Sequence, residues 1–473
     1  MSKRTKIVAT LGPSTDSPEV LDGLLEAGVD VVRLNFSHGS EADRERRVRE
    51  IREAAARAGR DVGILGDLQG PKIRVERFSD GPVSLREGAR FALDTALAAD
   101  AGDAHAVGIS YKSLPGDVAP GDVLLLNDGA ITLEVQAVAG TRIDCVVKVG
   151  GLLSDNKGIN RQGGGLSAGA LTAKDREDIR HAATLDLDFL AVSFPRSAAD
   201  IEEARALLAE AGGQALMVAK IERAEAVERI EEIARASEVV MVARGDLGVE
   251  IGFAEVPGVQ KNIIRVARSL NRIIITATQM MESMIHEPIP TRAEVSDVAN
   301  AVIDGTDAVM LSGETAVGRY PVKAVQAMAG ACVSAEKQRA TSISHHRMDQ
   351  VFQRTDEAIA MATMYIANHM NVKAIVALTE SGSTALWMSR IRSGIPIYAF
   401  SRNEGTRRRV VLYRGVYPVP FDVTLTGDDG FGLVCEALKS RGIVAEGDRI
   451  LLTEGREAGV AGGTNTLRVL MVG

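Results

Sequence analysis

Short runs of apolar, largely β-branched residues recur along the first 340 residues of the chain. Most of them are followed by a helical pattern with recognisable ends; Ser17 and Pro18, for example, open a helix that stops at Gly28. Near-continuous apolar strands that alternate with helices are typical of a parallel sheet covered by helices. Eight such runs predict a closed (β/α)₈ or TIM barrel, with strands at 6–12, 29–36, 62–68, 188–194, 215–222, 239–246, 272–279 and 307–314.

The spacing of these runs is interrupted once. Successive strands begin about 20 to 35 residues apart, except that about 125 residues separate the third from the fourth. Residues 72–167 are rich in turns and alternate apolar with polar positions, which predicts a small β-barrel domain inserted as a lid at the barrel mouth. After residue 338, four further strands around one good helix predict a separate α/β domain. We therefore expect an α/β protein with a barrel (1–71 and 168–338), a lid (72–167) and a C-terminal α/β domain (339–473).

Composition narrows the class of protein. With 473 residues, 45% of them apolar, the chain can bury a large core. Its net charge of −8 offers no general basic face for nucleic acid or an anionic membrane. Three widely spaced cysteines give neither a disulfide framework nor metal-ligand spacing, and no apolar run reaches the ~20 residues of a membrane span. We expect a soluble, cytoplasmic protein without nucleic-acid or membrane partners.

Polar residues gather at the ends of five predicted barrel strands. Because side chains alternate along a strand, residues i and i+2 share a face, and the carboxyl ends of barrel strands form the usual active site. The pattern brings together Arg33, Asn35 and Ser37, Lys220 and Glu222, Arg244 and Asp246, Thr276 and Thr278, and Ser312 and Glu314.

Two interpretations of these polar ends stand side by side. A structural salt-bridge network at the barrel rim would explain any single pair. Five adjoining strands favour a site, because charges at a barrel mouth must pair or hold ligands. Glu222 and Asp246 could share Mg²⁺, and the N–H groups around Gly245 could bind a carboxylate. Metal-assisted phosphoryl or enolate chemistry uses all of these residues, with the cations for a phosphate or oxyanion being Arg33, Lys220 and Arg74.

Nine segments carry a resemblance to a known family. In order within residues 5–321 they are TKIVATLGPS, VVRLNFSHG, GDLQGPKIR, NKGIN, VAKIE, MVARGDLGVE, TATQMMESM, PTRAEVSDVANAVIDGTDAVMLSGET and YP. Together they closely resemble the pyruvate kinases, specifically bacterial members with the LQGPK motif. The resemblance implies a catalytic barrel, a lid and an effector-binding C-terminal domain. It further implies phosphoryl transfer from phosphoenolpyruvate to ADP, giving pyruvate and ATP in glycolysis, with Mg²⁺ or Mn²⁺, in a homotetramer.

The resemblance also assigns roles in the active site. Glu222 and Asp246 fall on the metal ligands, and Lys220 falls on the lysine that stabilises the enolate and the transferring phosphoryl group. Arg33 matches an arginine that contacts that phosphoryl group. Thr278 matches a threonine that binds the substrate carboxylate and relays the proton. The N–H groups around Gly245 and Asp246 would hold the same carboxylate. On the nucleotide side the matching residues are Arg74, Lys157, His38 and Asn35.

A potassium site is implied at the end of the third strand. Its matching groups are Asn35, Ser37, Asp67 and the carbonyl of Leu68. Potassium-dependent relatives carry a glutamate where this chain has Lys72. We therefore expect a K⁺-independent enzyme in which the ammonium of Lys72 lies near Asp67 and replaces the ion. The alternative is that Lys72 is solvated at the lid hinge while K⁺ still binds.

A loop in the C-terminal domain suits a phosphate. In the segment TESGSTALWMSR, a strand precedes and a helix follows the group Thr379, Ser381, Gly382, Ser383 and Thr384. An ordinary capped helix explains the loop equally well on its own, but the resemblance implies an allosteric site for a phosphorylated effector, a sugar monophosphate or AMP. Arg407–Arg409 and the GGTNT loop near Gly463 could contribute; a solvated basic face also explains the arginines.

Two other functions fit parts of the sequence. A Mg²⁺-dependent pyruvate-enolate lyase or aldolase could use the same barrel, but it needs neither the lid lysine Lys157 nor the nucleotide-side Arg74. A non-catalytic metabolite sensor could use the C-terminal domain, but it would not need to keep Lys220, Glu222 and Asp246 together.

Overall fold

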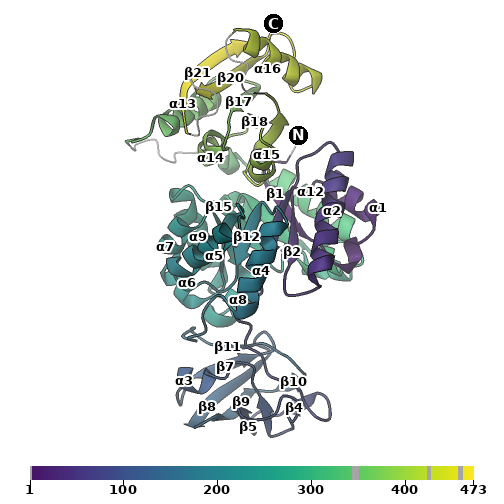
Figure 1. Cartoon of the computed structure of the whole chain (residues 1–473), viewed down its shortest axis with the longest axis vertical. Coiled ribbons are helices and arrows are strands. Elements are labelled where there is room, and N and C mark those ends of the chain that lie inside the picture. Colours follow the sequence, from purple (N-terminus) through teal and green to yellow (C-terminus); the bar gives the residue numbers. More distant parts are fainter. Residues whose placement is uncertain (1–2, 343–350, 423–427, 456–461) are drawn as a thin grey trace.

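A computed structural model describes residues 3–342, 351–422, 428–455 and 462–473 of the chain. Three parts lie in a row along the longest axis of the molecule: a β-rich domain, a central barrel and a C-terminal α/β domain (Figure 1). Within the described residues, no helix has the length and apolar character needed to cross a membrane.

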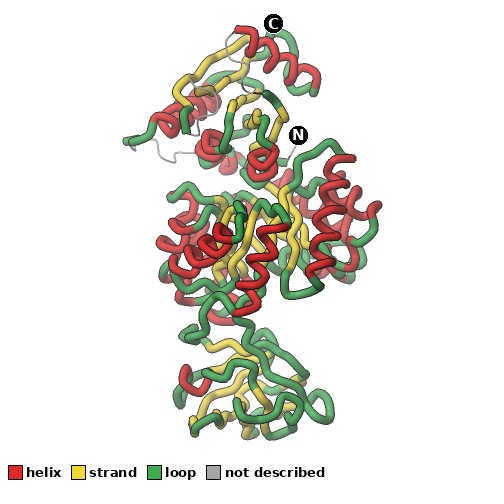
Figure 2. Tube along the Cα trace, viewed as in Figure 1, coloured by secondary structure: helices red, strands yellow, loops and turns green. Residues whose placement is uncertain are grey.

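The central part is a closed barrel of eight parallel strands, as the sequence predicts. Figure 2 shows strands of this part, in yellow, lying among red helices. Neighbouring strands follow the order β1-β16-β15-β14-β13-β12-β3-β2 around the barrel. Every predicted strand is present, although each is shorter than its apolar run. The strands are β1 (Lys6–Thr10), β2 (Val31–Asn35), β3 (Gly63–Asp67), β12 (Phe189–Val192), β13 (Leu216–Ile221), β14 (Val239–Ala243), β15 (Ile273–Ala277) and β16 (Ala308–Leu311).

Helices surround this barrel and begin where capping residues predict them. The Ser17 side chain accepts a hydrogen bond from the N–H of Val20, and Gly28 closes the same helix at a φ of 109°. The longer helices are α1 (Pro18–Ala27), α2 (Glu41–Arg57), α4 (Ala173–Thr184), α5 (Ala198–Glu210), α9 (Val256–Ser269), α10 (Arg292–Asp304) and α12 (Pro321–Ala335). Shorter ones are α6 (Ala224–Glu228), α7 (Ile230–Ala236), α8 (Arg244–Ile251), α11 (Gly313–Ala316) and the 3₁₀ turns η1 (Pro13–Thr15), η2 (Glu282–Ile285) and η3 (Arg339–Thr341).

The β-rich domain leaves the barrel after β3 and returns before α4, so it lies at the carboxyl ends of the strands. Its apolar core is its own, and includes Phe91, Leu133 and Cys145. A six-stranded sheet in the order β11-β7-β8-β9-β5-β6 and a β10–β4 pair enclose this core. The elements are β4 (Val83–Leu85), β5 (Arg90–Asp94), β6 (Ala106–Gly108), α3 (Leu114–Asp117), β7 (Val123–Leu126), β8 (Ile131–Ala139), β9 (Arg142–Val149), β10 (Gly151–Leu153) and β11 (Ile159–Arg161).

The C-terminal domain has a five-stranded sheet in the order β19-β18-β17-β20-β21. It contains the four predicted strands, a fifth strand, β19, and more helices than the one expected. The sequence pattern did not predict β19 because it contains Pro418 and Pro420, which cannot donate backbone hydrogen bonds. The sheet tolerates these prolines because β19 is an edge strand. The elements are α13 (Thr355–His369), β17 (Ala374–Leu378), α14 (Ser383–Ser389), β18 (Ile397–Ser401), α15 (Glu404–Val410), β19 (Val416–Pro420), α16 (Asp428–Ser440), β20 (Arg449–Gly455) and β21 (Thr464–Met471).

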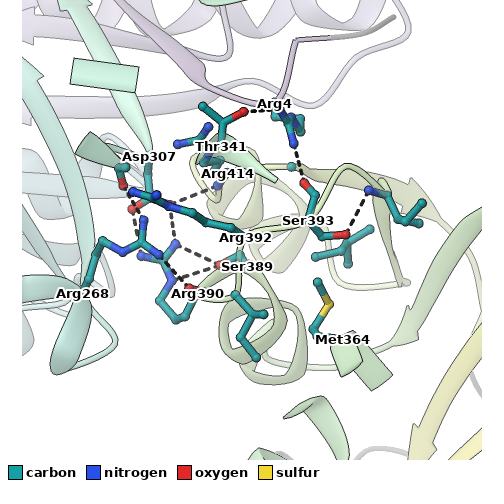
Figure 3. A pocket seen from close by; sticks show the side chains of 15 residues that line it. Arg4, Arg268, Asp307, Thr341, Met364, Ser389, Arg390, Arg392, Ser393 and Arg414 are labelled. Carbon is teal, nitrogen blue, oxygen red and sulfur yellow. Dashed lines mark hydrogen bonds and ion pairs between the residues drawn. The ribbon is translucent and has the colours of Figure 1, made fainter. Parts of the chain in front are cut away.

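This domain packs against the amino ends of the barrel strands. One continuous apolar cluster includes Leu65 and Phe189 of the barrel and Met364 of α13. At its edge, Arg390 donates to both carboxylate oxygens of Asp307, one of them at 2.8 Å, and both side chains are only 2% exposed (Figure 3). The barrel and the C-terminal domain therefore share a core and a buried ion pair.

Candidate active site

Four charged side chains form a chain of ion pairs at the carboxyl ends of the barrel strands. Arg33 on β2 donates through Nε to Oδ2 of Asp67, at the end of β3, over 2.6 Å. Lys220 on β13 lies between two carboxylates, with Nζ 3.2 Å from Oδ1 of Asp67 and 3.0 Å from Oε1 of Glu222. None of these side chains is more than 12% exposed. The sequence predicts that these residues meet, and the structure brings them together.

Burial and mutual charge determine how these groups ionise. Burial alone would raise the pKa of Asp67, but Lys220 and Arg33 outweigh it and hold that pKa below its ordinary value. Burial opposes the charge of Lys220, yet Asp67 and Glu222 raise its pKa, so the ammonium form is kept. Burial raises the pKa of Glu222; Lys220 opposes that rise, and the charges of Asp246 and Asp67 add to it. Glu222 is therefore the carboxylate in this group that lacks sufficient positive charge.

Glu222 and Asp246 fit a magnesium or manganese ion. Mg²⁺ in proteins is held by one or two carboxylates plus waters and substrate oxygens, so it needs no larger cage. In the part of the chain that is described, no cluster of three or more His, Cys, Asp or Glu side chains could hold a metal. The charge of Asp246 raises the pKa of Glu222, so the two carboxylates are close enough to repel each other. A divalent cation between them would remove that repulsion.

The end of β14 differs from the expected strand. The strand stops at Ala243 and α8 begins at Arg244, which places Asp246 in the first turn of a helix. Arg244 and Asp246 therefore do not share a strand face, and the expectation that they do is wrong. Arg244 is buried and pairs with Asp297 over 2.7 Å, bracing α10. The N–H of Gly245 donates to Oγ1 of Thr278 at 2.8 Å.

The end of β15 also departs from simple alternation. Thr278 and Gln279 both have left-handed backbones, with φ of 67° and 53°. Since alternation holds only while the backbone is extended, Thr276 does not face the mouth beside Thr278. Thr276 is fully buried and donates to Oγ1 of Thr306 at 3.0 Å. Thr278 thus keeps its expected place beside Gly245, and Thr276 is structural.

Ser312 and Glu314 after β16 have structural roles too. Glu314 lies in α11, is 2% exposed and accepts hydrogen bonds from the N–H groups of Met281 and Ser312. Both of its oxygens hold backbone at the ends of neighbouring strands. The predicted pair Ser312 and Glu314 therefore stabilises the rim of the barrel.

Ser193, which follows β12, is a site residue that sequence reasoning missed. Its Oγ accepts a hydrogen bond from Nζ of Lys220 at 2.6 Å and donates to the carbonyl of Leu68 at 2.7 Å. The next residue, Phe194, donates its N–H to Oε2 of Glu222 at 2.9 Å. The available signal was a hydroxyl residue directly after an apolar strand, at the same end of the barrel as the charged residues.

Groups assigned to the monovalent cation site already have hydrogen-bond or ion-pair partners within the protein. Asn35 accepts the N–H of Ser37 at 3.0 Å, and the Leu68 carbonyl accepts from Ser193. Among the described residues, the ion pairs of Asp67 are with Arg33 and Lys220, not with Lys72. Lys72 is exposed and lines a cleft of about 150 Å³ that also contains Asp246. In this conformation Lys72 belongs to the lid cleft, because the chain turns toward the lid after Gly70.

The residues assigned to the nucleotide come from two sides. Arg74 donates to the carbonyl of Asn156 at 2.7 Å, so it lies beside Lys157 in the lid. Asn35 and the exposed His38 lie on the barrel at the end of β2. Across the described residues, no hydrogen bond or ion pair joins the lid pair to the barrel pair.

The loop assigned to the effector is a tight turn between β17 and α14. The Thr379 side chain accepts the N–H of Gly382, which has a φ of 84°, and Thr384 hydrogen-bonds Thr464 of the GGTNT loop at 2.6 Å. Ser381 donates to Ser383 over 3.3 Å. The hydroxyl groups therefore lie close together, and Thr464 of the GGTNT loop lies against Thr384.

The arginines of α15 contact the barrel, so they do not form a freely solvated basic face. Arg407 pairs with Asp61 at 3.2 Å and Arg408 with Asp188 at 2.9 Å, both on the barrel. Arg409 donates to the carbonyl of Gln214. They are interdomain contacts, because α15 packs on the amino ends of barrel strands.

Fold and site together define a (β/α)₈-barrel enzyme whose mouth carries a buried lysine, an arginine and two candidate metal-binding carboxylates. Residues 2–325 match the family described as "Pyruvate kinase, barrel domain", and residues 357–470 match "Pyruvate kinase, alpha/beta domain". The chain therefore belongs to the pyruvate kinase family, whose members are phosphotransferases.

Individual relatives agree with this assignment over the whole chain. The chain is 55% identical to pyruvate kinase II of Salmonella typhimurium and 53% identical to the pyruvate kinase of Haemophilus influenzae, each alignment covering 99% of both proteins. Its structure superposes on that of a pyruvate kinase from Cryptosporidium parvum with a TM-score of 0.94 at 33% identity, covering 100% of this chain and 96% of the other.

Proposed function

We propose that this chain transfers the phosphoryl group of phosphoenolpyruvate to ADP at the barrel mouth, in the cytoplasm. The observation that carries the assignment to this site is the placement of Lys220 between Asp67 and Glu222, opposite Arg33. Glu222 and Asp246 would hold Mg²⁺ or Mn²⁺, which when bound supplies positive charge to the substrate oxygens.

The protein's own residues account for the rest of the reaction. An oxygen of the ADP β-phosphate bonds to the phosphorus of phosphoenolpyruvate while the bond from phosphorus to the enol oxygen breaks, which leaves the enolate of pyruvate. Lys220 stays protonated, since its carboxylate neighbours raise its pKa, and donates to the enolate oxygen and the moving phosphoryl group. Arg33 binds that phosphoryl group. A proton reaches the methylene carbon from the side of Thr278, and the products are pyruvate and ATP.

Substrate and nucleotide would be held from opposite sides. The first turn of α8, with Gly245 and Asp246, would offer backbone N–H groups to the substrate carboxylate, and the Gly245 N–H would exchange its present bond to Thr278 for that carboxylate. Arg74 and Lys157 on the lid, with Asn35 and His38 on the barrel, would bind the nucleotide when the lid closes. Closure would also exclude water, which otherwise competes with ADP for the phosphoryl group.

The test is the rate of pyruvate formation from phosphoenolpyruvate, with and without ADP. We expect one ATP for each pyruvate and no pyruvate without ADP. Lys220→Met should lower kcat by about 10²- to 10³-fold, as loss of a donor to developing charge does. Pyruvate formation independent of ADP would favour the lyase alternative, and an active Lys220→Met variant would remove the lysine from the mechanism.

We infer further that the enzyme does not require K⁺ and that Lys72 supplies the missing charge once the lid closes. It is supported by the exposed position of Lys72 in the cleft at the barrel mouth, from which its long side chain can move when the lid moves. Wild-type enzyme should reach its full rate in potassium-free buffer, whereas Lys72→Glu should require K⁺. Lys373→Glu makes the same charge change on an exposed residue of the C-terminal domain and should leave the rate unchanged. A wild-type rate that appears only with K⁺ would exclude Lys72 as the internal cation.

We also propose allosteric control through the loop from Thr379 to Thr384. The Thr406 side chain of α15 donates to the carbonyl of Glu380 over 2.5 Å, so a hydrogen bond connects the loop to the helix that packs against the barrel. A phosphorylated ligand that moves the loop would thereby move α15 and its contacts with Asp61 and Asp188.

The effector hypothesis is tested with a hexose 6-phosphate and with AMP. One of them should lower the concentration of phosphoenolpyruvate needed for half the maximal rate. Ser383→Asp, which places a negative charge in the loop, should abolish the response and leave the basal rate unchanged. An unaltered response in that variant would move the effector site elsewhere. Light scattering should give the mass of four chains if the enzyme is a homotetramer.

A further inference from the structure

The ammonium group of Lys220 is fully used in this structure. A lysine ammonium has three N–H hydrogens. Nζ lies 2.6 Å from Oγ of Ser193, 3.0 Å from Oε1 of Glu222 and 3.2 Å from Oδ1 of Asp67. Ser193 accepts a hydrogen bond, and the two carboxylates are ion-pair partners, so the protein's own oxygens surround the ammonium group. Lys220 can donate to a reacting group only after one of these acceptors is given up.

Ser193 differs from the other two acceptors because it is neutral and rigidly held. The nearer acceptor for its hydroxyl hydrogen is the Leu68 carbonyl at 2.7 Å, and Oδ1 of Asp67 lies farther away at 3.3 Å, which leaves an oxygen lone pair for Lys220. Ser193 is 1% exposed, so no solvent can replace it as an acceptor. Asp67 is held by Arg33 in addition to Lys220. Glu222 accepts the Phe194 N–H through Oε2, so Oε1 is the acceptor that can be withdrawn from Lys220, since Glu222 is also a candidate metal ligand.

Backbone packing fixes the position of the Ser193 hydroxyl. Phe194 has a left-handed backbone, with a φ of 55°, which is unusual for a bulky residue. This turn aims Ser193 at Lys220 and the Phe194 N–H at Glu222. It fits only because residue 70 is glycine: a Cβ there would lie 2.8 Å from Cβ of Ser193 and 2.9 Å from Cδ2 of Phe194.

We propose that Ser193 is a positioning residue for Lys220. With Asp67, it holds two N–H groups of the ammonium, so that the third N–H would point at the enolate and phosphoryl oxygens once Glu222 no longer accepts it. Without the serine oxygen, the ammonium keeps a single fixed acceptor and can rotate. The inference rests on the proposed role of Lys220 and adds the residue that orients it.

Three substitutions separate the oxygen of Ser193 from its volume. Ser193→Ala removes the oxygen, and Ser193→Cys fills the space with a weak acceptor. Both should lower kcat by about 10- to 100-fold, the range for a hydrogen bond to a charged group, while KM for phosphoenolpyruvate changes less than about threefold. Ser193→Thr restores the oxygen and should recover most of kcat. Ser237→Ala, which removes another buried serine hydroxyl far from Lys220, should leave kcat unchanged.

A binding measurement provides a second readout. Oxalate has the planar O–C–C–O arrangement and the charge of the enolate, so it requires the released N–H of Lys220. Titration calorimetry in the presence of Mg²⁺ should show that Ser193→Ala binds oxalate about tenfold more weakly than the wild type. Pyruvate, and Mn²⁺ titrated without any other ligand, should each bind to the variant as they bind to the wild type. Equal losses for oxalate and pyruvate would mean general damage to the site and would overturn the proposal.

The outcomes also separate this inference from the proposed function. If the wild type forms no pyruvate, the proposed function itself is wrong. If the wild type is active, Lys220→Met is inactive and Ser193→Ala keeps full kcat, only the role of Ser193 is refuted. Recovery of kcat by Ser193→Cys would equally refute it, because filled space and not the oxygen would then matter. Should Ser193→Thr fail to fold against Gly70, the comparison of Ala with Cys still decides.

Discussion

Glu250 lies on α8 one turn after Asp246 and is only 4% exposed. Burial raises its pKa to about 7; the N–H of Ala224 and the charge of Arg223 oppose this rise, and the charges of Glu225 and Asp246 add to it. The variant Glu250→Gln keeps an oxygen for the Ala224 N–H, 3.0 Å away, but cannot ionise. It isolates the charge of one buried carboxyl group beside the lid cleft.

The sign of the effect follows from the order of ionisation. In the unfolded chain the carboxyl loses its proton near pH 4.5, and in the folded protein only near pH 7. Between these values the unfolded chain holds fewer protons, so the free energy of unfolding falls as the pH rises. The difference between the two pKa values corresponds to about 3 kcal/mol of unfolding free energy, because a shift of one pKa unit is worth about 1.4 kcal/mol. Glu250→Gln should therefore be more stable by about 3 kcal/mol at pH 8 and by only about 1 kcal/mol at pH 5.

The assay is thermal unfolding followed by circular dichroism, for both proteins, across this pH range. A gain of about 3 kcal/mol should raise the melting temperature by roughly 5 °C at pH 8, with much less change at pH 5. Glu255→Gln, the same charge change at an exposed position before α9, controls for net charge. A melting difference that is the same at both pH values would refute the assignment of a raised pKa to Glu250.

Two further substitutions test packing. Gly70→Ala should lower the melting temperature and reduce kcat at least tenfold, because the new Cβ would lie 2.8 Å from that of Ser193 and residue 70 has a φ of 68°; wild-type melting and kcat would show that the turn tolerates a side chain. Arg390→Met leaves the carboxylate of Asp307, 2% exposed, without its cation, and should cost about 3–5 kcal/mol. Urea unfolding followed by the fluorescence of Trp387, the single tryptophan and a residue of α14, measures this loss, and an unchanged midpoint would mean that the ion pair contributes nothing.

Periodicity predicted the barrel because each strand is a short apolar run between helices with clear caps. The same reasoning predicted Lys220 and Glu222 correctly, since β13 is extended through Ile221 and its alternation is preserved. It failed for Arg244, where the strand gives way to α8, and for Thr276, where the left-handed backbone begins two residues later. Alternation is a property of extended backbone, and the sequence alone does not show where extension stops.

The pattern of apolar and polar residues could not predict contacts between segments that are distant in the sequence. Arg407 and Arg408 are adjacent basic residues on a helix, and only the packing of α15 on the barrel reveals Asp61 and Asp188 as their partners. Ser193 was missed for a related reason. A single serine after an apolar strand has no distinctive pattern, and its importance comes from Lys220, which reaches it from the neighbouring strand.

The charge at the barrel mouth indicates the order in which the site is filled. Two cations, Arg33 and Lys220, face three carboxylates, Asp67, Glu222 and Asp246, so the formal charge favours a cation over an anion. The pKa of Glu222 is raised mainly by burial, and the charges of Asp246 and Asp67 add to that rise, so a nearby positive charge would favour its ionised form. An anionic substrate would be repelled until a divalent cation reverses the balance. If Glu222 and Asp246 held such a cation, Glu222 would be drawn from Lys220 and the third N–H of Lys220 would be freed, so metal binding before substrate would both admit the substrate and prepare the donor that acts on it.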